Sequence, residues 1–247
     1  MAHALGIPKE ALYAHPEVTL STAEALRVSA LVLRRAAGEP VAYLRGSKEF
    51  HGHELAVDPR VLIPRPETET LVDAALAFVQ RSGARTAADV GSGSGAIAIA
   101  LALGAPSLRV IALDASPGAL EVARVNIARH GVADRIEIRE GDLLAPLDTP
   151  VDLVVANLPY LRDPERLASL AFEPAIALYA GVDGLSLVRR AIADLPRVLA
   201  PRGAAFFEID PAQAGVVARS LEVAVGSAAL VLYDLAGDAR VVAVERS

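Results

Sequence analysis

The sequence of 247 residues contains no cysteine, and only two of its 24 basic residues are lysines. The lack of cysteine excludes a disulfide framework and any metal site built on thiolates. The longest apolar run, residues 96–105, contains a glycine and is far shorter than the ~20 residues that a membrane span requires. The first ten residues hold neither a basic nor an apolar segment, so no secretory signal is visible. We therefore expect a cytoplasmic protein without a membrane segment.

An excess of positive charge is also missing. The chain carries 24 Lys and Arg against 30 Asp and Glu, a formal net charge of −6. Residues 1–83 hold 9 basic and 10 acidic side chains, and residues 84–247 hold 15 and 20. Neither region is the basic body of a protein whose affinity rests on neutralising phosphates. Direct nucleic-acid binding is therefore not expected.

A hydrophobic content of 53% excludes a disordered chain and allows one large domain, or one with a small appendage. We place a boundary near residue 84. Residues 1–83 are expected to form a helical and hairpin region, and residues 84–247 a second, larger domain.

The first region shows three local signals. Ser21 and Glu24 form a capping-box pattern that opens a helix. Two short strands, residues 41–44 and 54–57, are expected to form a hairpin. Pro66 then starts a second helix, which Gly83 ends. The apolar faces of these two helices are predicted to hold Leu26, Ala30, Leu33 and Ala37 in the first, and Leu71, Ala75, Phe78 and Val79 in the second.

After Thr86, short apolar strands alternate with helices, which is typical of a parallel sheet covered on both faces. A final hairpin, with a turn at residues 237–238, should place the last strand antiparallel in the sheet. Helices are expected from about Gly95, Pro117, Gly184 and Pro211. The expected strands are 87–90, 109–113, 136–139, 153–156, 204–209, 229–233 and 240–244.

The turn from Asp89 to Gly95 reads Asp-Val-Gly-Ser-Gly-Ser-Gly between an expected strand and helix. Alternating glycines permit a tight turn and a close approach of a ligand to the backbone. The dinucleotide fingerprint instead has its third glycine three residues after the second. The pattern resembles motif I of the class I S-adenosylmethionine methyltransferases, and this implies an α/β, Rossmann-like fold and a cofactor site at Gly91, Ser92, Gly93, Ser94 and Gly95.

Two further acids follow the next strands. Asp114 ends the second strand, where a carboxylate can accept hydrogen bonds from both ribose hydroxyls of a nucleotide cofactor. Asp142 and Leu143 follow the third strand, where the same methyltransferase fold contacts adenine. An NAD enzyme could share the glycine turn and Asp114.

Asn157-Leu158-Pro159-Tyr160 ends the fourth strand and resembles the (N/D)PP(Y/F) signature of methyltransferases that act on planar amino or amide nitrogens. An amide nitrogen is a poor nucleophile because its lone pair is delocalised. The Asn157 side-chain oxygen and the Leu158 carbonyl can hold both N–H bonds, and Tyr160 offers a flat face. Leu158 replaces the usual first proline but still supplies a main-chain carbonyl. The resemblance makes all four residues catalytic and substrate-binding, and places Asn157 beside the cofactor.

The remaining motifs resemble those of the release factor glutamine N5-methyltransferases. They are Glu39–Gly46, Glu49–Gly52, Val61–Glu69, Phe172–Pro174, Asp183–Leu185 and the closing Asp234-Leu-x-Gly-x-x-Arg240. The resemblance implies S-adenosylmethionine as methyl donor, S-adenosylhomocysteine as product, and the Gln of the Gly-Gly-Gln motif of class 1 release factors as target. Arg65, Pro66 and Glu67 are implied to bind substrate.

Two departures from the family pattern stand out. About 38 residues precede Glu39, fewer than the family's N-terminal helical domain usually has, and Asp210 replaces the glycine of a common Glu-Ile-Gly. No metal is expected, since His51 and His53 alternate without an evident third ligand.

The alternatives are a ribosomal-protein glutamine methyltransferase, a DNA adenine-N6 methyltransferase, an NAD-dependent oxidoreductase and a non-enzymatic adenosylmethionine sensor. The DNA enzyme would need a basic cleft, and the oxidoreductase leaves residues 157–160 unexplained.

Overall fold

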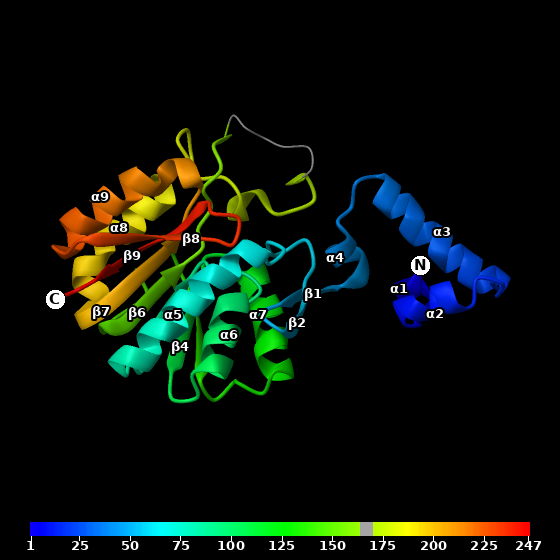
Figure 1. Ribbon diagram of the computed structural model, residues 1–247, viewed down its shortest axis with the longest axis horizontal. Helices are drawn as coiled ribbons and strands as arrows, with labels where there is room; N and C mark the ends of the chain where they lie inside the picture. Colours follow the sequence, from blue (N-terminus) through cyan, green and yellow to red (C-terminus); the bar gives the residue numbers. More distant parts are fainter. Residues whose placement is uncertain (164–169) are drawn as a thin grey trace.

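The computed structural model describes residues 1–163 and 170–247. Its larger part is built on a seven-stranded sheet in the order β5-β4-β3-β6-β7-β9-β8 (Figure 1). The strands β3 to β7 run parallel, and β9 lies antiparallel between β7 and β8. This arrangement confirms the expected sheet with its antiparallel C-terminal hairpin. The bounds are β3 (Thr86–Val90), β4 (Arg109–Asp114), β5 (Ile136–Glu140), β6 (Val151–Ala156), β7 (Leu199–Glu208), β8 (Ala229–Tyr233) and β9 (Ala239–Glu245).

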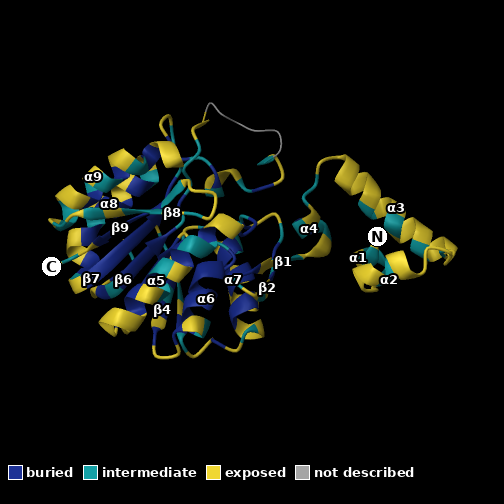
Figure 2. Cartoon of the chain, in the orientation of Figure 1, coloured by how far each residue is buried: buried dark blue, intermediate teal, exposed yellow. Residues whose placement is uncertain are grey.

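Helices cover both faces of the sheet. One face packs against α5 (Glu69–Ser82), α6 (Ala96–Gly104) and α7 (Pro117–Arg129), and the other against α8 (Ser186–Val198) and α9 (Ala214–Val225). The central strands are buried between these layers, as Figure 2 shows. Strands buried on both faces need apolar residues at successive positions, which explains the apolar runs in β3 and β6, each of which also contains one aspartate, Asp89 and Asp152. Within the described ranges, none of the helices combines the length and apolar character needed to cross a membrane.

The sheet has a topological switch point between β3 and β6. From β3 the chain moves outward through β4 to β5 and then returns to the other side of β3 as β6. Val90 and Ala156 are register partners at the carboxyl ends of these two strands. In open α/β sheets, ligands bind in the crevice at such a point, because the loops after the two strands diverge there. The glycine turn and residues 157–160 both leave the sheet at this crevice.

The N-terminal helices lie away from the sheet (Figure 1). They are α1 (Ala2–Leu5), α2 (Lys9–Ala14) and α3 (Thr22–Ala36), and none has a buried residue. Ser21 and Glu24 form the predicted capping box at the start of α3. The predicted apolar face is solvent-exposed, with Leu26 67% and Leu33 71% accessible. Half-buried Val28 and Leu31 instead line a groove shared with α1 and α2.

The predicted strand at residues 41–44 was wrong. These residues belong to a short helix, α4 (Val41–Arg45), which Gly46 ends in a left-handed conformation. The hairpin is instead formed by β1 (Ser47–Phe50) and β2 (His53–Ala56), with His51 and Gly52 at positive φ in its turn. Tyr43 is the buried residue of α4, and its hydroxyl donates a 2.7 Å hydrogen bond to the Val61 carbonyl, whereas Val41 is exposed.

Helix α5 lies before the expected domain boundary at residue 84 but packs into the core of the sheet domain. A short 3-10 helix, η1 (Pro66–Thr68), leads into it, and Gly83 ends it as predicted. Five of its residues are buried: Leu71, Val72, Ala75, Phe78 and Val79. The Phe78 and Phe206 rings have centroids 6.1 Å apart, which joins α5 to β7. The folding unit around the sheet therefore includes α5.

A pair of truncations tests this packing. Removal of residues 1–38 takes away no buried side chain and should leave the thermal unfolding transition cooperative. Removal of residues 1–83 takes away the core residues of α5. Burial of each large apolar side chain contributes ~1.5–3 kcal/mol to the free energy of unfolding, whose typical total is about 5–15 kcal/mol. That shorter chain should show no cooperative transition by calorimetry. A cooperative transition in residues 84–247 alone would contradict the assignment of α5 to the core.

Candidate active site

The glycine turn connects β3 to α6 in a conformation that side chains would strain. Gly91, Gly93 and Gly95 have φ values of 74°, 54° and 80°, which L-residues other than glycine rarely adopt. A Cβ atom on Gly95 would lie 3.4 Å from the Ala123 Cβ, so this position also allows α7 to pack closely. A Cβ on Gly93 would meet no atom within 4 Å, because the residue faces open space. The turn therefore exposes its backbone to a ligand at Gly93.

Asp114 is tied to the glycine turn before any ligand binds. Its carboxylate accepts hydrogen bonds from the backbone N–H of Gly93 and of Ser116, both at 2.8 Å. Burial raises the pKa of Asp114, and these two backbone hydrogen bonds partly oppose the shift. The carboxylate thus joins the ends of β3 and β4 and keeps further lone pairs available for hydroxyl donors.

A cavity of about 210 Å³ lies over the carboxyl ends of β3, β4 and β6. Of the predicted cofactor residues, Ser92, Ser94 and Gly95 support the turn without lining this cavity. Asp142 lines it and also pairs with Arg190 on the surface. The predicted residues that do line it are Gly91, Gly93, Asp114, Asp142, Leu143 and Asn157. Six positions from four separate segments are thereby brought together.

Asp89 lies beneath the turn and was not among the predicted site residues. One carboxylate oxygen accepts a 3.1 Å hydrogen bond from the Ala98 N–H, and the other is buried with no hydrogen-bond partner in the described part of the chain. The Ser92 hydroxyl is buried without a partner in the same way. Burial, together with the charge of Asp114, raises the pKa of Asp89 to about 7. A positively charged ligand over the turn would compensate this cost, and S-adenosylmethionine is such a ligand.

Asn157 stands at the wall between two cavities. With Leu158 and Pro159 it lines the cofactor cavity on one side and, on the other, a larger cavity of about 640 Å³. The Asn157 side-chain N–H donates a 3.0 Å hydrogen bond to the Thr68 hydroxyl oxygen. Its side-chain oxygen receives no hydrogen bond from the residues described, so it is available to a ligand where the two cavities adjoin.

Leu158 is 3% exposed and packs against the glycine turn. A Cβ on Gly91 would lie 3.1 Å from the Leu158 Cδ2 atom, so the leucine side chain fills the space directly above that glycine. Pro159 restricts residue 158 to extended backbone. The leucine that replaces the usual proline is thus held by packing, and its side chain has a structural contact that the sequence did not indicate.

Tyr160 is held through its main chain. Its carbonyl oxygen accepts a 3.2 Å hydrogen bond from the Gln213 side chain. Gly184 lies against the same carbonyl, and a Cβ atom at position 184 would collide with it, so only glycine permits this close approach of the two backbones. Gln213 is oriented by a capping box with Asp210, which begins the 3-10 helix η5 (Pro211–Gln213). Asp210, the unexplained departure from the family pattern, therefore helps to order the residue that supports Tyr160.

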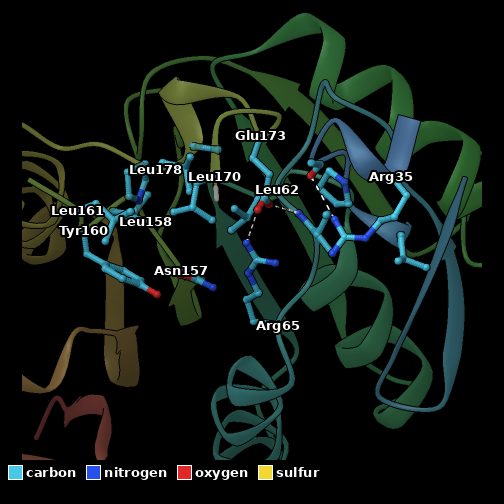
Figure 3. A pocket seen from close by; sticks show the side chains of 16 residues that line it. Arg35, Leu62, Arg65, Asn157, Leu158, Tyr160, Leu161, Leu170, Glu173 and Leu178 are labelled. Atoms are coloured by element: carbon cyan, nitrogen blue, oxygen red, sulfur yellow. Dashed lines mark hydrogen bonds and ion pairs between the residues drawn. The ribbon is translucent and has the colours of Figure 1, made fainter. Parts of the chain in front are cut away.

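Arg65 lies at the larger cavity and is anchored by a buried acid. Its guanidinium pairs with Glu173, whose other oxygen accepts a 3.0 Å hydrogen bond from the Ile63 N–H, as Figure 3 shows. Two motifs 108 residues apart in sequence are joined by this pair. Pro66 and Glu67 are exposed and do not line the cavity; they form the start of η1.

The histidines lie on the hairpin surface. His51 bonds Asp73 at 2.9 Å, and the His53 ring lies 5.6 Å from that of His130. Over the described ranges, no group of three or more His, Asp or Glu side chains is placed to hold a metal ion.

Besides Asp89, the buried polar residues that the sequence did not assign to the site include Thr68, Glu208 and Asn126. Thr68 lies inside a motif that was recognised for its neighbours. Glu208 is a charged residue at the end of an apolar strand, and Asn126 is a polar residue on an apolar helix face. A polar residue in an apolar pattern was the signal that could have identified these two. Asn126 exchanges two hydrogen bonds with Ala56 of the hairpin and donates a third to the Ser94 carbonyl. It therefore links the hairpin to the glycine turn.

Comparisons with known proteins indicate the class of protein to which the chain belongs. A family model described as the PrmC N-terminal domain matches residues 1–46, and one described as the methyltransferase small domain matches residues 69–175. The structure resembles a ribosomal protein L11 methylase from Lactobacillus delbrueckii (TM-score 0.56, 24% identity, covering 77% of this chain and 84% of that one). It also resembles a methyltransferase from Pyrococcus furiosus (TM-score 0.59, 14% identity, covering 89% and 98%). The fold and the site together define an S-adenosylmethionine-dependent methyltransferase.

Curated relatives narrow this class. A release factor glutamine methyltransferase of Deinococcus radiodurans is 38% identical over all of this chain and 89% of its own length. One from Cereibacter sphaeroides is 39% identical over 98% of this chain and 87% of its own. The chain belongs to the release factor glutamine methyltransferase family.

The raised pKa of Asp89 predicts how cofactor affinity depends on pH. The ionised carboxylate favours a cationic ligand, and below about pH 7 a growing fraction of the free protein carries the neutral acid. Affinity for S-adenosylmethionine should therefore fall as pH is lowered from 8 to 6, by up to about tenfold per unit below the pKa. Isothermal calorimetry would measure it.

Asp89→Asn is the matched control, because the amide keeps the shape and the Ala98 hydrogen bond without the charge. It should bind more weakly and lose the extra pH dependence, since ionisation of the ligand itself affects both proteins equally. If the dissociation constants of the two proteins changed with pH in the same way, Asp89 would have no electrostatic role in cofactor binding.

Proposed function

We propose that this protein transfers a methyl group from S-adenosylmethionine to the side-chain amide nitrogen of a glutamine, leaving S-adenosylhomocysteine. The proposed target is the Gly-Gly-Gln glutamine of class 1 peptide-chain release factors, a substrate that would place the reaction in the cytoplasm. Family membership supports this target. The observation that carries the proposal is the position of Asn157 and Leu158 in the wall that separates the cofactor cavity from the larger one.

The chemistry requires positioning rather than an activated nucleophile on the protein. When bound, S-adenosylmethionine supplies a methyl group made electrophilic by its sulfonium charge. The Asn157 side-chain oxygen and the Leu158 carbonyl would each accept one N–H of the target amide, which holds the nitrogen at the boundary between the cavities. Such fixed polar contacts contribute through orientation and preorganised electrostatics.

The atoms balance without a strong base. The new N–CH₃ bond forms as the S–CH₃ bond breaks, and the amide nitrogen then carries an extra proton. That nitrogen is strongly acidic, so its proton can pass to water.

The larger cavity has features that suit a loop of another protein. Part of its wall comes from the segment before the hairpin, where Arg35, Gly38, Pro40 and Val41 contribute. Arg65 adds a cation that Glu173 holds in place. Beyond the cavity, exposed apolar side chains of α3, among them Leu26 and Leu33, provide surface for a macromolecular partner. We propose that residues 1–83, apart from α5 in the core of the sheet domain, dock the release factor, while the sheet domain holds the cofactor.

The direct test is incubation of the purified protein with a class 1 release factor and methyl-labelled S-adenosylmethionine. Label should appear on the Gly-Gly-Gln glutamine by mass spectrometry, and a release factor with alanine at that position should stay unlabelled. Asn157→Ala should reduce the single-turnover rate by ~10²–10³, the scale for loss of one preorganised polar contact to a reacting group. Label on a ribosomal protein but not on the release factor would contradict the proposed target.

Leu158 provides a separate prediction, because its backbone and side chain have different roles. Leu158→Ala removes packing against Gly91 and should lower stability by ~2–4 kcal/mol, while the carbonyl and the rate at low temperature are largely retained. Leu158→Pro restores the common signature and should leave the rate equal or modestly higher. Thermal unfolding and single-turnover rates with saturating substrates would measure both. An alanine variant that is folded but as slow as Asn157→Ala would show that the side chain itself takes part in the reaction.

A further inference from the structure

Three polar residues from different elements meet behind the wall between the cavities. Asn157 follows β6, Thr68 ends η1, and Glu208 is the last residue of β7. Ala156 and Phe207 are register partners, so Asn157 and Glu208 leave adjacent parallel strands at the same level. Thr68 and Glu208 are 4% and 1% exposed. They therefore form a buried layer behind Asn157.

The hydrogen bonds in this layer run in one direction. The Asn157 N–H donates to the Thr68 hydroxyl oxygen at 3.0 Å. The Thr68 side chain is also a hydrogen-bonding neighbour of the Glu208 carboxyl group, and this interaction lowers the pKa of Glu208 and so favours the charged carboxylate. A hydroxyl has a single proton to donate, and an ionised carboxylate can only accept. With its proton committed to Glu208, the Thr68 oxygen can only accept from Asn157. The Asn157 amide group must then turn its nitrogen toward Thr68 and its oxygen away.

This direction matters because the two ends of a carboxamide have nearly the same shape and differ in hydrogen bonding. If Thr68 were free to donate, it could bond the Asn157 oxygen and stabilise the reversed amide. The reversed amide would present N–H groups to the N–H groups of a target glutamine, and neither would have an acceptor.

We propose that Thr68 and Glu208 are positioning residues for methyl transfer: Glu208 orients the Thr68 hydroxyl, and Thr68 orients Asn157 so that its oxygen accepts the target N–H. This inference rests on the proposed function of the site. It adds two residues that touch neither cavity and that act only through Asn157.

The cost of burying Glu208 supports a role beyond packing. Its second carboxylate oxygen is buried with no hydrogen-bond partner among the described residues, an arrangement that structures normally avoid. Arg240, itself paired with Asp234 at 3.1 Å, and Arg65 lie near enough to favour its charge, whereas Glu67 opposes it. Burial dominates these effects and raises the pKa of Glu208 to about 7. An apolar residue would fill the same space without this cost.

The test compares single-turnover rates at saturating release factor and S-adenosylmethionine, and at pH 8, above the pKa of Glu208, where its carboxylate is ionised and can only accept. Thr68→Val keeps the shape but removes the hydroxyl, and should slow methyl transfer about ten- to a hundredfold, less than the loss of a group that touches the amide. Thr68→Ser restores the hydroxyl and should return the rate to within about threefold of the parent. The dissociation constant of S-adenosylmethionine should stay within about twofold in both variants.

Thr86→Val is the matched control. Thr86 also donates its hydroxyl to a carboxylate, Asp152 at 3.0 Å, but at the opposite end of the same sheet. Its loss should lower the unfolding temperature without slowing methyl transfer. A similar slowing in Thr86→Val and Thr68→Val would show that the effect of Thr68 is general destabilisation, and would overturn the proposal.

A double-mutant cycle separates action through Asn157 from a merely structural role. If Thr68 acts only through Asn157, Thr68→Val should cost no further rate in the Asn157→Ala background. Additive losses would overturn the proposal, and so would a Thr68→Val rate within twofold of the parent. The parent rate alone reports on the proposed function, so failure of that function is recognised separately.

Glu208→Gln tests the other end of the network. The amide can donate as well as accept, so it no longer fixes the direction of the Thr68 hydroxyl, and the rate should fall about tenfold or more. An unchanged rate would overturn the role of Glu208. If Thr68→Val and Glu208→Gln both lost cofactor binding while Thr86→Val kept it, the network would be structural and the proposal would fail.

Discussion

The pairing of β3 with β6 is the constraint on which the site depends. Because these parallel strands are neighbours without being consecutive, the turn after one and the tetrapeptide after the other open into the same crevice. The Leu158 side chain packs on Gly91 within that crevice. A methyl donor and an acceptor amide must meet in line where the two cavities adjoin, and two adjacent strand ends bring the cavities together at Asn157 and Leu158.

Hydrogen bonds from outside the two strands then fix this wall. Asp114 holds the glycine turn from β4, Thr68 holds Asn157 from the start of α5, and Asn126 ties the turn to the hairpin. Each of these groups is buried or nearly so, where a polar contact is stronger than in water and an unpaired group is costly. The resulting rigidity suits a reaction in which orientation supplies most of the catalysis.

The sequence predicted the sheet and the helices that cover it, because buried parallel strands and glycine turns leave strong local signals. Of the proposed cofactor residues, those that line one cavity are Gly91, Gly93, Asp114, Asp142, Leu143 and Asn157. The sequence was misleading at residues 41–44, where a four-residue apolar run fits a strand or a helix equally and only the flanking Pro40 and Gly46 favour the helix. It also placed an apolar face on α3 that is exposed, since periodicity shows that a face exists but not what covers it. Thr68 and Glu208 escaped notice because their partnership joins residues 140 positions apart.

Two buried carboxylic acids with pKa values near 7 lie in this site, and they are compensated in different ways. Each carboxylate has one oxygen without a hydrogen-bond partner among the described residues. The nearby charge at Asp89 is the like charge of Asp114, whereas Glu208 has the nearby opposite charge of Arg240. Both folded-state pKa values exceed those of an unfolded chain, so each group stabilises the fold at low pH and loses that contribution as pH rises through about 7. At neutral pH the fold therefore carries an electrostatic cost at the site where chemistry takes place. A cationic cofactor would relieve the electrostatic cost at Asp89, whereas the cost at Glu208 would remain in the bound state. This difference is expected if Asp89 contributes to cofactor binding and Glu208 to the orientation of Thr68 and Asn157.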